Sequence, residues 1–255
     1  TSNKLSERGE KYLLKNVFFC LGVISTTKLI LELEQAFDIA IPLKTTPLGY
    51  FLIFTSKKRQ NDTAFGISGL SYNFNNHDDL ISGGIFPCNI EILSYYKYLN
   101  CLPKFLKLLI DKILLQRMFI GNVFFSSSMS SNQIKIFENG KCFIEGKNHK
   151  SLKKNFKKIK KSLNISLKGF NMRILPGIGK LAVPGSDVHY SGTLPIDEDN
   201  FSKLKCDNSG KLFGHENLYI ADACLLKDLP GKPHTLHSIS QSILIVKKFI
   251  VSNSV

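Results

Sequence analysis

The chain has 255 residues, a net charge of +14 and 43% hydrophobic residues, so it can bury a core in one large or two modest domains. No signal-peptide pattern opens the sequence, and no run of about 18 uncharged apolar residues predicts a membrane span. The six cysteines include no CxxC pair, so we expect neither a zinc site nor a disulfide scaffold and favour a reducing, cytoplasmic setting.

The positive charge comes mainly from lysine, with 30 Lys and 4 Arg against 20 Asp and Glu. Arginine is the residue that recognises phosphates and bases through paired hydrogen bonds. Because arginine is scarce, nucleic acid is not the expected partner. Since the sequence starts at Thr1, without Met, and soon enters an apolar run, we also expect that its start has been removed.

The first predicted unit is a strand, a glycine turn and a helix. Residues 17–21 form a continuous apolar run, which is typical of a buried parallel strand, and Gly22 follows. The hydroxyl residues 25–27 predict the cap of a helix that continues to about Glu34.

The middle of the chain, residues 45–147, predicts an antiparallel sheet flanked by helices. Asn139 and Gly140 indicate a hairpin, because both tolerate the positive φ angles of a type I′ turn. The segment 90–115 is predicted to be mostly helical. The expected strands cover residues 50–54, 64–70, 120–125, 133–137 and 142–145.

An amphipathic helix is predicted over residues 150–163. One stripe is apolar and the opposite face is lysine-rich. We interpret the lysine face as solvated surface, with contact to an anionic membrane or partner as the alternative. The apolar stripe consists of Leu152, Phe156, Ile159 and Leu163.

The last fifty residues have the same predicted order of strand, turn and helix as the first forty. The strand covers Leu218–Ala221 and the helix covers Thr235–Phe249. We expect the two ends to pack together and the β-rich middle to be inserted between them. The predicted fold class is therefore α/β, or α+β overall. One domain is predicted from residues 1–44 and 200–255, and the other from residues 45–199.

Three of the six histidines, His189, His234 and His237, lie in the segments that carry candidate chemistry. Histidine titrates near neutral pH, and two imidazoles suit the removal of a hydroxyl proton. Asp222 follows the strand at 218–221, at the kind of sheet edge where open α/β sheets bind ligands. The other histidines, His77, His149 and His215, are interpreted as structural or surface residues.

Three segments, taken in order, resemble the C-terminal half of the glucose–methanol–choline (GMC) family of flavin-dependent oxidoreductases. His189, with Gly192–Thr193, matches the family's His-x-x-Gly-Thr segment. Residues 217–223, Asn-Leu-Tyr-Ile-Ala-Asp-Ala, match its Asn-Leu-Tyr-Val-x-Asp-Ala/Ser signature. Residues 17–29 are similar to its apolar strand, Ala-Gly turn and helix start.

The resemblance implies that the two chain ends belong to an FAD-binding domain and that residues 45–199 form a substrate domain. It implies oxidation of the CH–OH group of a small-molecule alcohol or sugar, with hydride transfer to FAD and an unidentified electron acceptor. His189 would be the catalytic base and His234 the second catalytic residue. Gly22, Asp222, Ala223 and Thr235 would contact FAD, and no metal is expected.

The chain departs from the family pattern in several places. Pro233 occupies the position of the usual Asn, so that His234 replaces it only with a shift of one residue, and His237 is the fallback. Leu21 and Cys224 stand where the family usually has Ala and Ser. The Gly-x-Gly-x-x-Gly loop that holds the FAD pyrophosphate is absent, so we interpret the chain as the back half of a flavoenzyme.

An alternative hypothesis is a non-catalytic binding module derived from an oxidoreductase, whose basic surface contacts an anionic partner. A hydrolase is disfavoured because the sequence has no Gly-x-Ser-x-Gly elbow.

Overall fold

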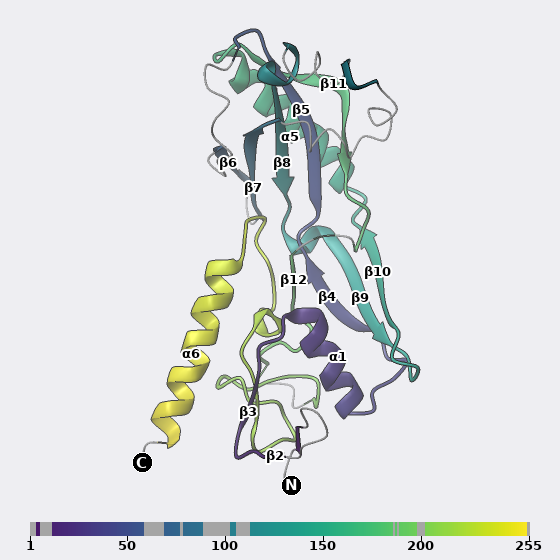
Figure 1. The fold of residues 1–255 in the computed structure, drawn as a ribbon, viewed down its shortest axis with the longest axis vertical. Helices are drawn as coiled ribbons and strands as arrows, with labels where there is room; N and C mark the ends of the chain where they lie inside the picture. Colours follow the sequence, from purple (N-terminus) through teal and green to yellow (C-terminus); the bar gives the residue numbers. More distant parts are fainter. Residues whose placement is uncertain are drawn as a thin grey trace.

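The computed structural model contains a five-stranded antiparallel sheet, a four-stranded antiparallel sheet and a parallel strand pair (Figure 1). The structure describes residues 4–5, 12–58, 69–76, 79–88, 103–105, 113–185, 187, 189–197 and 202–253. Helices and antiparallel sheets are mixed, which confirms the predicted α+β class.

The five-stranded sheet has the strand order β11-β5-β8-β7-β6, and each neighbouring pair is antiparallel. Alternate residues of a strand point to opposite faces, so Phe51 and Ile53 lie on the face that α5 (Leu152–Lys168) covers. The apolar stripe predicted for this helix is buried there, and the helix extends five residues beyond the predicted end. The strands are β5 (Leu48–Thr55), β6 (Leu70–Asn76), β7 (Asp79–Pro87), β8 (Met118–Phe124) and β11 (Met172–Leu181).

The four-stranded sheet has the order β10-β9-β4-β12. The predicted hairpin is present, but the type I′ turn is wrong: only Gly140 has a positive φ, and Phe137 pairs with Lys141 around a three-residue loop. A loop of this length needs one left-handed residue, so Asn139 keeps a negative φ. The strands are β4 (Ile41–Thr45), β9 (Ser130–Ile136), β10 (Cys142–Asn148) and β12 (Tyr190–Ser191).

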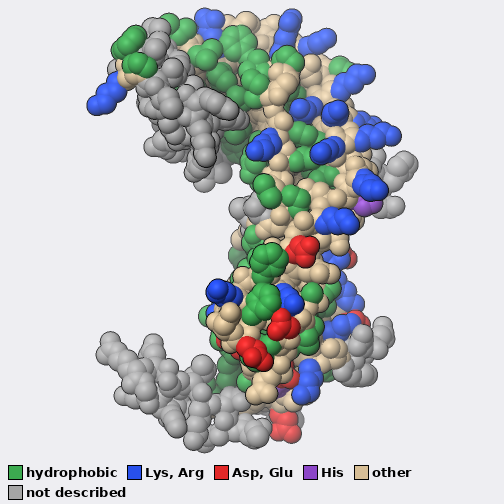
Figure 2. Space-filling view, turned by 90° about the vertical axis from the view of Figure 1, so that its right-hand side faces the viewer, with side chains coloured by type: hydrophobic (Ala, Val, Ile, Leu, Met, Phe, Trp, Pro, Cys, Tyr) green, Lys and Arg blue, Asp and Glu red, His purple; other side chains and the backbone are tan. Residues whose placement is uncertain are grey.

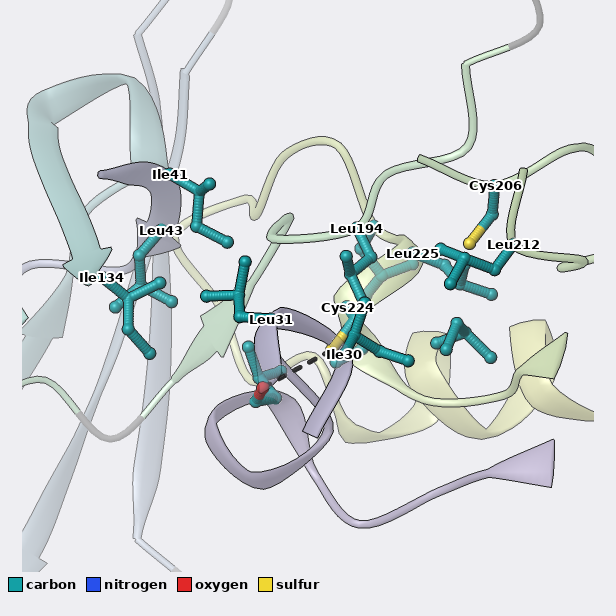
Figure 3. Close-up of a cluster of buried hydrophobic side chains, with 14 of the residues drawn as sticks. Ile30, Leu31, Ile41, Leu43, Ile134, Leu194, Cys206, Leu212, Cys224 and Leu225 are labelled. Carbon is teal, nitrogen blue, oxygen red and sulfur yellow. Dashed lines mark hydrogen bonds between the residues drawn. The ribbon is translucent and has the colours of Figure 1, made fainter. Parts of the chain in front are cut away.

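The two chain ends meet in a parallel pair, β3 (Val17–Phe19) with β13 (Leu218–Ile220). β3 is two residues shorter than expected, and Leu21 beyond it is 56% exposed. Helix α1 (Val23–Leu33) begins earlier than residues 25–27 predicted, with Gly22 as its N-cap. The first helix and the strand pair share a core with β4 and β9 (Figure 3). That core includes Ile30, Leu31, Ile41, Leu43, Ile134, Leu194 and Leu225.

The last helix, α6 (Thr235–Asn253), contacts the strand pair along one narrow line. Its Phe249 ring lies 5.0 Å from Phe18 and 5.1 Å from Tyr219, and Ile245 is buried in the shared core. Most of its other apolar side chains are exposed. Among the described residues, no helix is both long enough and apolar enough to cross a membrane.

The remaining described elements are short. β1 (Lys4–Leu5) pairs with β2 (Tyr12–Leu13), and η1 (Leu115–Arg117) and η2 (Ser127–Met129) are single 3-10 turns. Much of the helix expected over 90–115 and of the strand expected over 64–70 lies outside the described residues. The domain boundaries stay a prediction.

Replacing Leu163 with Ala should lower the free energy of unfolding by about 2–5 kcal/mol, because the side chain is only 6% exposed and its loss leaves a cavity under α5. Ile165→Ala, on the outward side of the same helix, is the matched control and should change it by less than about 0.5 kcal/mol. Urea unfolding measures both. Equal losses would show that α5 is not packed as described.

Candidate active site

The parallel pairing of β3 and β13 places two predicted cofactor residues at one sheet edge. Ile220 lies opposite Phe19, so the carboxyl ends of the two strands coincide, and Gly22 and Asp222 follow them directly. Gly22 has a φ of +83°, which suits glycine, and a Cβ there would meet no atom within 4 Å. The space in front of Gly22 is therefore open.

Asp222 is buried at this edge, with 8% of its surface exposed, and both carboxylate oxygens accept hydrogen bonds. The Thr26 hydroxyl donates to Oδ2 at 2.5 Å, and the backbone N–H of Cys224 donates to Oδ1 at 2.8 Å. Thr26 lies in the first turn of α1, where the helix dipole favours a negative charge. Asp222 therefore joins the last strand to the first helix, and its oxygens retain lone pairs for a further donor.

The thiol beside this carboxylate is not a nucleophile. Burial, followed by the charge of Asp222, raises the pKa of the Cys224 thiol well above its ordinary value. The reactive form of cysteine is the thiolate, so Cys224 is inert at neutral pH.

The two predicted catalytic histidines lie together. The rings of His189 and His234 are 5.0 Å apart between centroids and nearly perpendicular. His189 stacks on Phe124 at the end of β8, and its Nδ1 lies 2.9 Å from Oγ1 of Thr46. His234 precedes α6 directly, and its buried Nδ1 has no hydrogen-bond partner among the residues that the structure describes.

Both imidazoles are held in the neutral form. Burial is the main cause that lowers the pKa of His189, and the positive charge on a protonated His234 lowers it further. The pKa of His234 is lowered by burial and then by His237. At neutral pH each ring therefore keeps a nitrogen lone pair that can accept a proton.

Two hydrogen bonds join the segment after His189 to the sheet edge. The backbone N–H of Gly192 donates to the carbonyl of Ala223 at 3.3 Å, and the Thr27 hydroxyl donates to the Thr193 hydroxyl at 2.7 Å. Ala223 opens η3 (Ala223–Leu225) directly after Asp222. His189 precedes Gly192 by three residues, which an extended chain spans in roughly 10 Å.

A buried polar cluster, which the sequence did not reveal, holds the segment that leads into His189. The Thr45 hydroxyl donates to Oδ2 of Asp187 at 2.7 Å and accepts a hydrogen bond from Asn132 Nδ2 at 2.6 Å. Burial raises the pKa of Asp187, and the hydrogen bond from Thr45 opposes this shift. Because Thr46 follows Thr45, the cluster holds the stretch of backbone that carries the hydroxyl contacting His189.

The structure thus brings His189 and His234 together, and separately Gly22, Asp222 and Ala223. Thr235 is exposed at the first position of α6, next to His234. Of the three histidines interpreted as structural, His215 contacts Glu34 and His149 contacts Ser151, whereas His77 lies outside the described residues. Thr46 and Phe124 carried no local signal, because their link to His189 exists only in the folded chain.

The sequence matches no protein-family model and no curated protein. In structure, the chain is similar to pyridoxine 4-oxidase from Mesorbium loti, with a TM-score of 0.56 and 12% sequence identity. The match covers 96% of this chain and 53% of the other, so this chain spans about half the length of pyridoxine 4-oxidase. At this identity, the likeness establishes a shared fold.

Replacing His234 with Ala should raise the pKa of His189 towards its ordinary value near 6.5, because the substitution removes the repulsion that opposes protonation of both rings and admits water. NMR titration of the imidazole resonances measures the shift. His237→Ala is the matched control and should raise the pKa of His234 instead. A pKa of His189 that stays the same or falls would contradict the described pairing.

Proposed function

We propose that the chain is the C-terminal portion of a GMC-type, FAD-dependent oxidoreductase that oxidises the CH–OH group of a small alcohol or sugar. The observation that carries the proposal is the pair of neutral imidazoles, His189 and His234, whose ring centroids lie 5.0 Å apart, and one buried nitrogen of the pair finds no partner in the described part of the chain. The fold likeness to pyridoxine 4-oxidase, a GMC-family flavoenzyme, supports it.

The hydrogen bond between His189 Nδ1 and Thr46 Oγ1 is compatible with the tautomer that the role requires. When Nδ1–H donates to Thr46 Oγ1, the lone pair of the neutral ring is on Nε2, which can accept the hydroxyl proton of a substrate. The His234 ring, whose centroid is 5.0 Å from that of His189, is close enough to serve as the second hydrogen-bonding group at the substrate oxygen. The stacked Phe124 ring limits the rotation of His189 and shields one of its faces.

The residues at the sheet edge fit one end of a flavin site. Gly22 borders open space, Ala223 is held by Gly192, and Thr235 presents an exposed hydroxyl beside His234. FAD, when bound, would accept the hydride that leaves the carbon as the proton leaves the oxygen. Asp222 would orient backbone groups of η3 towards it through the bond to Cys224.

A complete flavin site would also need a pyrophosphate-binding loop, which this chain does not contain. The chain has no Gly-x-Gly-x-x-Gly loop, and it spans 53% of pyridoxine 4-oxidase. In the described part, β3 pairs with β13 and with no strand on its other edge. We infer that a parallel strand carrying the pyrophosphate loop adds at this edge, because parallel sheets are normally extended and covered on both faces.

His189→Gln in the complete gene product should leave FAD content unchanged and slow anaerobic flavin reduction by about 10²–10⁴-fold, because the substrate hydroxyl loses its base. Flavin bleaching with a panel of primary alcohols, sugars and pyridoxine measures the rate. His149→Gln, beside Ser151 and remote from the pair, is the control and should keep the original rate. A complete gene product that takes up no FAD would refute the proposal and favour the binding-module hypothesis.

A further inference from the structure

The excess positive charge is confined to one part of the chain. Of the 34 Lys and Arg residues, 11 lie within residues 146–186, and this stretch has no Asp or Glu. The rest of the chain, with 23 basic and 20 acidic residues, is close to neutral. A general bias towards lysine would spread the charge along the chain, so the location itself requires an explanation.

The stretch folds into α5 and β11, and the lysines gather over this end of the molecule in Figure 2. The outward face of α5, opposite its buried stripe, consists of Lys154, Lys157, Lys158, Lys161, Ile165 and Lys168. We call it the lysine face. Among the described ion pairs, none involves a lysine of this face.

One large apolar side chain, Ile165, is exposed among the lysines of this face, with 63% of its surface exposed. A solvated face gains no free energy from exposing it. Clustered lysines next to an acidic lipid surface each contribute to binding, and an exposed apolar side chain among them can enter the head-group region.

We propose that the lysine face docks on an anionic lipid surface, with the lysines at the head groups and Ile165 in the interface. Nucleic acid is the less suitable partner, because Arg173 is the one arginine of the stretch and apolar side chains add nothing to phosphate contacts.

Docking by this face leaves the candidate active site accessible. Val123 of β8 is buried on the α5 side of the sheet, so its neighbour Phe124 points to the opposite side, where it stacks on His189. The inference is therefore independent of the proposed function, and one can fail without the other.

The test is co-sedimentation of the complete gene product with vesicles of phosphatidylcholine alone or mixed with phosphatidylglycerol, at rising salt. The proposal expects binding to the anionic vesicles only, and binding should weaken as salt increases. Replacing Lys154, Lys158 and Lys161 with Gln should weaken it about tenfold or more. The matched control replaces Lys227, Lys247 and Lys248, outside the lysine face, with Gln and should have little effect.

Ile165→Ser should weaken binding severalfold and leave its salt dependence unchanged. Equal binding to neutral vesicles would overturn the proposal and point to the exposed side chains of α6. Equal losses in both triple variants would show that only net charge matters, and tighter binding to duplex DNA than to vesicles would assign the lysine face to nucleic acid. Thermal unfolding of each variant confirms that it is folded.

Discussion

The buried hydrogen bond between Thr26 and Asp222 joins segments that are 196 residues apart, and the candidate active site depends on it. β3 and β13 have three residues each, too few for an isolated pair to be stable. The carboxylate is satisfied by the first turn of α1 and by the backbone of η3, so it fixes strand, helix and turn relative to one another. η3 in turn bonds Gly192, three residues after His189, so the chain that carries the imidazole is attached to the sheet edge.

The second constraint is the passage of the chain from one sheet to the other. β4, in the four-stranded sheet, ends at Thr45, and β5, in the five-stranded sheet, begins at Leu48, so a link of two residues connects the sheets. Asp187 and Asn132 bond the Thr45 hydroxyl within the protein, and a buried polar cluster of this kind is favourable only when its members are paired. The histidine pair therefore lies where the two sheets meet. His189 contacts Thr46, in the link between the sheets, and Phe124, at the end of β8.

The sequence predicted what local patterns determine: the apolar strands, the buried stripe of α5 and the meeting of the two chain ends. It misplaced the start of α1, because the Thr26 hydroxyl bonds a distant carboxylate instead of capping its own helix. It assigned the wrong turn around Asn139, because turn type depends on strand register as well as on residue preference. The candidate catalytic residue His189 was found from its motif, whereas its partner Thr46, 143 residues earlier, has no pattern that could reveal it.

The central proposal is that the two imidazoles face the flavin ring of a bound FAD, and that the rest of the cofactor passes the start of α1. The most direct measurement is a crystal structure of the complete gene product grown with FAD. The account predicts the isoalloxazine ring within hydrogen-bonding distance of His189 or His234 and the dinucleotide running past Gly22. A flavin bound elsewhere, with the histidine pair directed away from it, would contradict the account.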